Sequence, residues 1–123
     1  MTFCPAQSVV QHPSQAANRT AFVFHGILGH QRNWRSFARA FTQQHPDWRF
    51  VLVDLRNHGA SHGAHAPHTV HQAAEDVLEI VSTQGTPDAV IGHSFGGKVA
   101  ITFSTLVDVK QTWVLDAIPR PQS

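Results

Sequence analysis

Residues 89–97 read Ala-Val-Ile-Gly-His-Ser-Phe-Gly-Gly, a short apolar run followed by the pattern G-x-S-x-G. This pattern predicts a nucleophile elbow, in which a serine lies at positive φ between a strand and a helix. Gly92 and Gly96 stand two residues before and two after Ser94 and leave room for so tight a turn. The turn exposes the hydroxyl beside the first N–H groups of the helix. Ser94 is the candidate nucleophile, and a plain structural turn is the alternative.

The rest of the chain alternates between strand and helix patterns. Apolar runs predict strands at 21–24, 50–53, 89–91 and 112–115, and amphipathic periodicity predicts helices at 34–41, 70–81 and 99–107. Strands joined by helices favour right-handed crossovers, so we expect a parallel sheet with helices on both faces, ordered second, first, third, fourth. Residues 1–19 are expected to be poorly ordered or to form one short strand, and residues 20–123 to form one α/β domain.

A second glycine-rich segment, His25–Gly29, follows the first predicted strand. Acyl transfer needs two N–H donors aimed at the developing oxyanion, and a glycine-rich turn can present a backbone amide without obstruction. The amides of Ile27 and Phe95 are the expected pair, with an ordinary loop as the alternative for the first of them. The supporting residues are His25, Gly26, Gly29, Gly92, His93 and Gly96.

Polar residues also follow the second predicted strand. Asp54 and Arg56 are expected to pair with each other and with loop backbone. Histidines then recur every three or four residues, at positions 58, 62, 65, 68 and 71. A zinc site needs ligands that converge, and this segment contains Gly63 and Pro67, which give it no fixed face. We therefore predict a solvated loop, with no metal and no cofactor.

No histidine follows Ser94, because all ten lie at or before position 93. Enzymes built on this elbow place an acid and then the histidine base after the serine. His93 points away from Ser94 if the turn is tight, so it is interpreted as a supporting residue. Asp116 is the one local candidate for the acid, and an aspartate that bonds nearby backbone is the alternative. The 123-residue polypeptide is therefore expected to be impaired or inactive alone.

Composition narrows the class of protein further. A formal charge of +1 without a basic run gives no electrostatic reason to expect nucleic-acid binding. The single cysteine, Cys4, excludes a disulfide framework, and no apolar stretch is long enough to span a membrane. We expect an intracellular protein in a reducing compartment, the cytoplasm or an organelle, that is not secreted. The apolar strand at 112–115 is expected to be an exposed edge through which the chain self-associates.

Together these segments resemble the amino-terminal half of an α/β-hydrolase-fold serine hydrolase, within the small esterase and thioesterase group of abhydrolase (AB hydrolase-1) domains. The match spans residues 20–119 and is carried by His25–Gly29, Asp54–Ser61, Gly92–Lys98 and Leu115–Pro119. The resemblance implies a partial α/β-hydrolase fold of about four parallel strands, with the carboxyl-terminal half missing. It also implies hydrolysis of small carboxylic esters or thioesters through an acyl-enzyme on Ser94. The alternatives are a non-catalytic module that binds a small molecule or a partner, and an incomplete product with no folded state.

Overall fold

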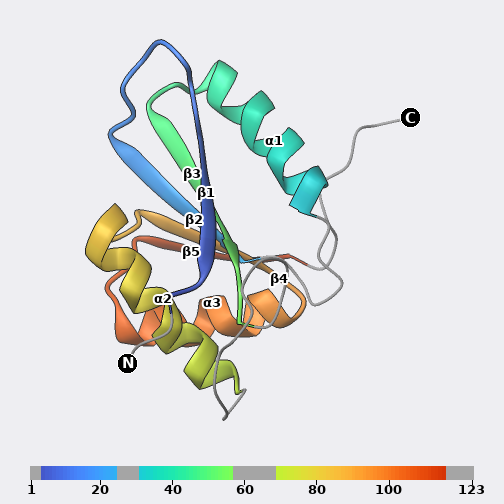
Figure 1. The fold of residues 1–123 in the computed structure, drawn as a ribbon, viewed down its shortest axis with the longest axis vertical. Helices are drawn as coiled ribbons and strands as arrows, with labels where there is room; N and C mark the ends of the chain where they lie inside the picture. The colour runs from blue at the N-terminus through green and yellow to red at the C-terminus, as the bar shows by residue number, and fades with distance from the viewer. Residues whose placement is uncertain (1–3, 25–30, 57–68, 116–123) are drawn as a thin grey trace.

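The computed structural model describes residues 4–24, 31–56 and 69–115 of the chain. Its elements are β1 (Ala6–Gln11), β2 (Arg19–Phe24), α1 (Gln31–Gln44), β3 (Trp48–Asp54), α2 (Val70–Gln84), β4 (Ala89–His93), α3 (Phe95–Leu106) and β5 (Gln111–Leu115). The strands form one sheet in the order β1-β3-β2-β4-β5 (Figure 1). The strands β3, β2, β4 and β5 are parallel, which confirms the expected class and order. β1 adds an antiparallel edge strand, with Ala6 opposite Asp54.

Helices cover both faces of the sheet, and each face has its own core. α2 and α3 pack on one face, around a cluster that includes Phe22, Phe24, Val77 and Phe103. α1 packs on the opposite face with Trp34 and Ala38, over side chains of β2, β3 and β4. The two helical layers are visible on opposite sides of the sheet in Figure 1. This arrangement follows from the sequence, because buried parallel strands need apolar side chains on both faces.

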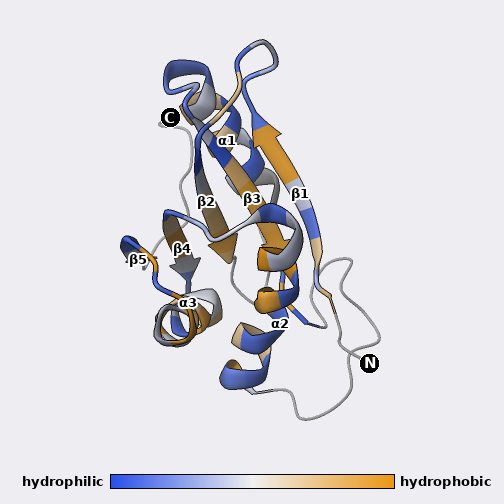
Figure 2. Ribbon diagram, turned by 90° about the vertical axis from the view of Figure 1, so that its left-hand side faces the viewer, coloured by the Kyte–Doolittle hydropathy of each residue, from blue (hydrophilic) through white to orange (hydrophobic). Residues whose placement is uncertain are grey.

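The central strands β2 and β3 are the most buried part of the sheet. From Thr20 to Phe24 every residue of β2 is buried, and so is every residue of β3 from Phe50 to Asp54. Hydropathy colouring shows β3 as largely orange toward its carboxyl end (Figure 2). Both strands therefore stay buried up to their carboxyl ends, and the candidate site residues follow these ends in the sequence.

Asp88 ties the amino ends of three parallel strands together. Its carboxylate accepts a hydrogen bond from the Thr20 backbone N–H at 2.9 Å, and its own N–H donates to the Thr20 carbonyl at 2.8 Å. The Gln111 N–H donates to the Asp88 carbonyl at 3.2 Å. β2, β4 and β5 therefore start in fixed register, and their carboxyl ends reach the same edge of the sheet.

Candidate active site

Ser94 occupies the turn between β4 and α3 with φ 58° and ψ −122°. Among the described residues other than glycine, it alone has a positive φ. This conformation confirms the turn geometry predicted from the sequence. A non-glycine residue in this region costs on the order of 1–3 kcal/mol, so the surrounding structure must hold it there.

Glycine packing explains how the chain closes this turn. Gly92 is buried against the first turn of α3, and a Cβ at Gly92 would overlap the Gly96 carbonyl. That Cβ would also lie 2.7 Å from the Cα of Gly97. Only a glycine at position 92 of β4 lets the helix approach this closely, whereas the expected role of Gly96 stays a prediction.

The Ser94 side chain is exposed and makes no capping hydrogen bond to α3. The Ser94 carbonyl accepts from the Gly97 N–H at 2.9 Å, which starts the helix directly after the serine. Phe95 is the first residue of α3, and its half-buried side chain packs against the core beneath α2 and α3. The serine hydroxyl therefore lies at the positive end of a helix dipole, the environment that favours a developing negative charge.

His93 precedes Ser94 at the end of β4, opposite Leu115 of β5. Because side chains alternate along a strand, His93 shares the α1 face with Ile91, whereas Val90 belongs to the core on the other face. Its Nδ1 is buried and has no hydrogen-bond partner among the described residues. This placement on the α1 face fits a supporting residue.

Arg56, directly after β3, has a partner that the sequence did not predict. Its Nε and Nη2 donate to the carboxylate oxygens of Asp76 in α2 at 2.5 and 3.1 Å, and both side chains are buried. The expected pairing of Arg56 with Asp54 and with loop backbone stays a prediction, and Asp54 is buried at the end of β3. A signal for Asp76 did exist, because it lies on the apolar face of α2 with Ala73 and Val77, where a buried carboxylate needs a cationic partner.

Several predicted site residues lie outside the described part of the chain: His25, Gly26, Ile27, Gly29, the histidines of residues 57–68, and Asp116. The structure therefore describes Phe95 of the predicted oxyanion pair but not Ile27. The remaining histidine of the loop series, His71, bonds Glu75 on the exposed side of α2 at 2.8 Å. Within residues 4–24, 31–56 and 69–115, no group of three or more His, Cys, Asp or Glu is arranged to hold a metal ion.

The family model of the α/β hydrolase fold matches residues 22–107, and the chain belongs to this family. A Haemophilus influenzae protein, an esterase/lipase by name, is 35% identical over 112 residues, covering 87% of this chain and 37% of its own length. Mouse sn-1-specific diacylglycerol lipase ABHD11 is 38% identical over 88 residues, covering 69% of this chain and 28% of its own length. The chain thus spans about a third of these relatives.

Solved structures give the same fold. A thermophilic esterase from Thermogutta terrifontis superposes with a TM-score of 0.74 at 20% identity, covering 96% of this chain and 42% of the esterase.

In the described residues no helix has the length and apolar character that crossing a membrane would require.

Proposed function

We propose that this chain carries the nucleophile of a serine hydrolase that cleaves carboxylic esters or thioesters through an acyl-enzyme on Ser94. The observation that carries the proposal is the positive φ of an exposed Ser94 at the β4–α3 junction. A strained serine at the amino end of a helix is the geometry of a nucleophile elbow. The names of the relatives, an esterase/lipase and a diacylglycerol lipase, support ester hydrolysis as the reaction class.

In the proposed reaction, the Ser94 oxygen attacks the acyl carbon while a base takes the hydroxyl proton. The backbone amides of Phe95 and Ile27 stabilise the oxyanion, and the alcohol or thiol leaves with the proton. Water then attacks the acyl-enzyme, which releases the acid and restores Ser94. A histidine is the usual base, and none follows Ser94 within residues 1–123, so the proposal assigns the base to polypeptide outside this segment.

The test fuses residues 1–123 to the part of the Haemophilus influenzae relative that follows its matched region. We expect the fusion to hydrolyse p-nitrophenyl acetate and an acetyl thioester, and Ser94→Ala to lower kcat by at least about 10³-fold. Ser82→Ala is the matched control, because Ser82 is an exposed serine on α2 whose hydroxyl donates to the Glu79 carbonyl at 2.6 Å. Mass spectrometry of the quenched reaction is expected to place the acyl group on Ser94.

Circular dichroism of each fusion separates loss of chemistry from loss of folding. A folded fusion whose turnover survives Ser94→Ala would contradict the proposal. A folded fusion that binds the ester without any turnover would replace it with the non-catalytic binding module.

A further inference from the structure

A polar groove with a volume of about 390 Å³ lies between β1 and α1, at the edge of the sheet opposite β5. Arg35, Arg39 and Gln43 line it from α1, and Ser8 lines it from β1. The three α1 residues stand four positions apart, so they share one face of the helix. Because β3 and β2 lie between β1 and β4 in the sheet, this groove lies away from Ser94 (Figure 1).

The two arginines of this groove have no counter-charge in the described part of the chain. Neither Arg35 nor Arg39 lies within ion-pair distance of a carboxylate there. The sequence gives the reason, because residues 1–46 contain arginines at positions 19, 32, 35 and 39 and no Asp or Glu. The first acidic residue is Asp47, which pairs with Arg19 at 3.9 Å. This segment is therefore cationic, although the whole chain has a formal charge of only +1.

The spacing of the two arginines destabilises α1, and the described contacts do not compensate for it. Like charges one helical turn apart repel each other. Arg35 donates a hydrogen bond from Nη2 to the Ser8 hydroxyl at 3.4 Å, which directs its guanidinium toward β1. A guanidinium has five N–H donors, so most donors of Arg35 and Arg39 remain for an anion in the groove.

We propose that this groove, the Arg35–Arg39 groove, binds the phosphate monoester of an organic phosphate. A phosphate monoester carries about two negative charges at pH 7, which matches two unpaired arginines better than a single carboxylate does. Each guanidinium can donate two parallel N–H bonds to phosphate oxygens. The Ser8 hydroxyl and the Gln43 amide add neutral donors, and Pro13 offers an apolar contact for the carbon part of the ligand.

A phosphate monoester can come from a soluble compound or from a lipid headgroup, so the test uses both sources. Isothermal titration calorimetry measures the binding of glycerol 3-phosphate to residues 1–123, and we expect saturable 1:1 binding. Co-sedimentation is measured with vesicles of phosphatidylcholine and phosphatidic acid in equal parts, and with vesicles of phosphatidylcholine alone. Additional binding to the phosphatidic acid vesicles would assign the lipid headgroup as the source, and its absence would assign a soluble phosphate. Both results support the proposal.

Variants of the two arginines test the contacts directly. Arg35→Gln and Arg39→Gln are each expected to weaken the binding of glycerol 3-phosphate at least about tenfold, because each removes charge-assisted hydrogen bonds. Arg35→Lys keeps the charge but loses the two-point geometry, so we expect binding at least about threefold weaker. Arg19→Gln is the matched control, because it removes the same charge from an exposed arginine that pairs with Asp47. It is expected to change the affinity less than about twofold.

Chemical modification of the unmodified chain provides a measurement that needs no variant. Phenylglyoxal modifies accessible arginine side chains, and mass spectrometry locates the modified residues. Saturating glycerol 3-phosphate is expected to slow the modification of Arg35 and Arg39 at least about fivefold, because bound phosphate occupies their donors. The rate at Arg19 is expected to stay unchanged.

Three results would overturn the proposal. The first is the absence of glycerol 3-phosphate binding together with unchanged modification of Arg35 and Arg39. The second is an equal loss of affinity in Arg19→Gln and Arg35→Gln, which would show a general attraction of anions to a cationic chain. The third is binding to the phosphatidic acid vesicles without any binding of glycerol 3-phosphate, which would show attraction to an anionic surface only. Because no ester is present in these measurements, their failure would leave the hydrolase proposal for Ser94 unaffected.

Discussion

Arg56 and Asp76 form a buried, two-point ion pair that joins the carboxyl end of β3 to the middle of α2. Gln72 adds a hydrogen bond from its side-chain amide to the same carboxylate at 3.4 Å. Asp76→Asn removes the carboxylate charge that the buried Arg56 guanidinium contacts at two points. We expect the free energy of unfolding to fall by about 3 kcal/mol, measured by urea denaturation.

The neighbouring carboxylate supplies the control for this prediction. Glu75 is exposed and pairs with His71 one helical turn earlier. Glu75→Gln is expected to change the free energy of unfolding by less than about 0.5 kcal/mol. Equal losses in the free energy of unfolding for the two variants would show that the buried Arg56–Asp76 pair stabilises the fold no more than an exposed ion pair does.

Gly92→Ala tests the close approach of β4 and α3. The added methyl would overlap the backbone of Gly96, so the turn at Ser94 must open. We expect a loss of at least about 2 kcal/mol in thermal or urea unfolding. Gly85→Ala is the comparison, because Gly85 has φ 82° but open space around it, and should cost only about 1 kcal/mol. A smaller loss at Gly92 than at Gly85 would contradict the packing explanation.

The thiol of Cys4 offers a test of local electrostatics. Partial burial raises the pKa of Cys4, and the negative charges of Glu79 and Asp76 raise it further. A raised pKa keeps the thiol protonated to higher pH, so alkylation by iodoacetamide at pH 8 should be slower than for a free cysteine peptide. Glu79→Gln is expected to speed alkylation and to shift its pH profile downward. A profile identical to that of the peptide would contradict this prediction.

Turnover by residues 1–123 alone is expected to be negligible. Loss of the histidine base from a serine hydrolase costs about 10⁶-fold in kcat, and each oxyanion donor offsets only about 3 kcal/mol. The unfused chain and its Ser94→Ala variant should therefore hydrolyse p-nitrophenyl acetate at the same rate. A Ser94-dependent burst of product from the unfused chain would mean that an upstream histidine or a second subunit supplies the base.

The exposed edge strand β5, with Trp113 and Val114 each at least half exposed, is expected to make residues 1–123 self-associate. Exposed apolar strand edges pair with other chains when nothing covers them. Sedimentation velocity over a concentration series should show dimers or larger species, and Trp113→Lys should raise the monomer fraction. Leu78→Lys, at a 39% exposed leucine on α2, should leave the distribution unchanged. A monomer at all concentrations would contradict this prediction.

Local features of the fold were predictable from sequence, and pairings between distant segments were not. The turn at Ser94 depends on Gly92 and its immediate neighbours, so a short motif is enough to predict it. The apolar periodicity predicts a helix over 70–81, and α2 runs from Val70 to Gln84, where the Gly85 N–H donates to the Val81 carbonyl. The strand β1 carries no continuous apolar run, and its place follows only from pairing with β3, about forty residues away.

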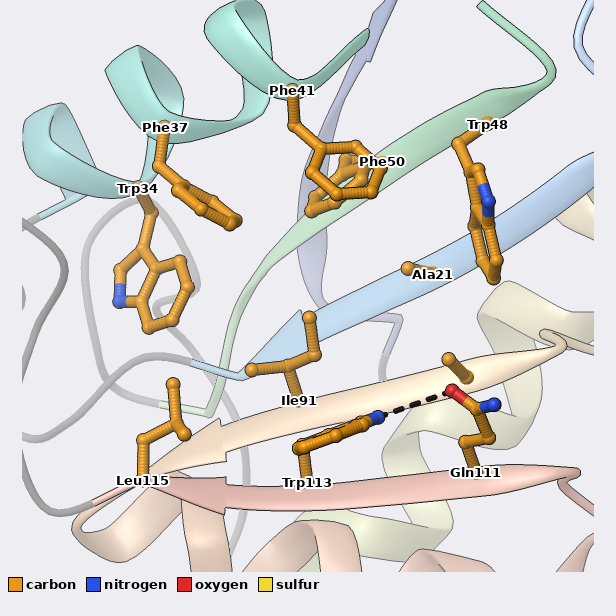
Figure 3. Close-up of a pocket in the computed structure, with 11 residues that line it drawn as sticks. Ala21, Trp34, Phe37, Phe41, Trp48, Phe50, Ile91, Gln111, Trp113 and Leu115 are labelled. Atoms are coloured by element: carbon orange, nitrogen blue, oxygen red, sulfur yellow. Dashed lines mark hydrogen bonds between the residues drawn. The ribbon is translucent and has the colours of Figure 1, made fainter. Parts of the chain in front are cut away.

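The candidate site also combines features that the local sequence predicts with features that depend on pairing between distant segments. Ser94 is identified by its own turn, whereas the Asp76 partner of Arg56 depends on how α2 lies against the end of β3. Another tertiary property is the open apolar groove lined by α1, β4 and β5, because it arises where the aromatic side chains of α1 face β4 and β5 across open space (Figure 3). The periodicity of the sequence does not predict which part of a sheet face is left uncovered by a helix.

The bonds between Asp88 and Thr20 have a consequence at the far end of the sheet. Each residue of a strand advances the chain by about 3.3 Å, so a slip of one position between β2 and β4 would shift Ser94 by that amount against β2. Such a slip would also turn the alternating side chains of β4 to the wrong faces. The hydrogen bonds between Asp88 and Thr20 at the amino ends of the strands therefore help to fix the position of Ser94 relative to β2 at the other end.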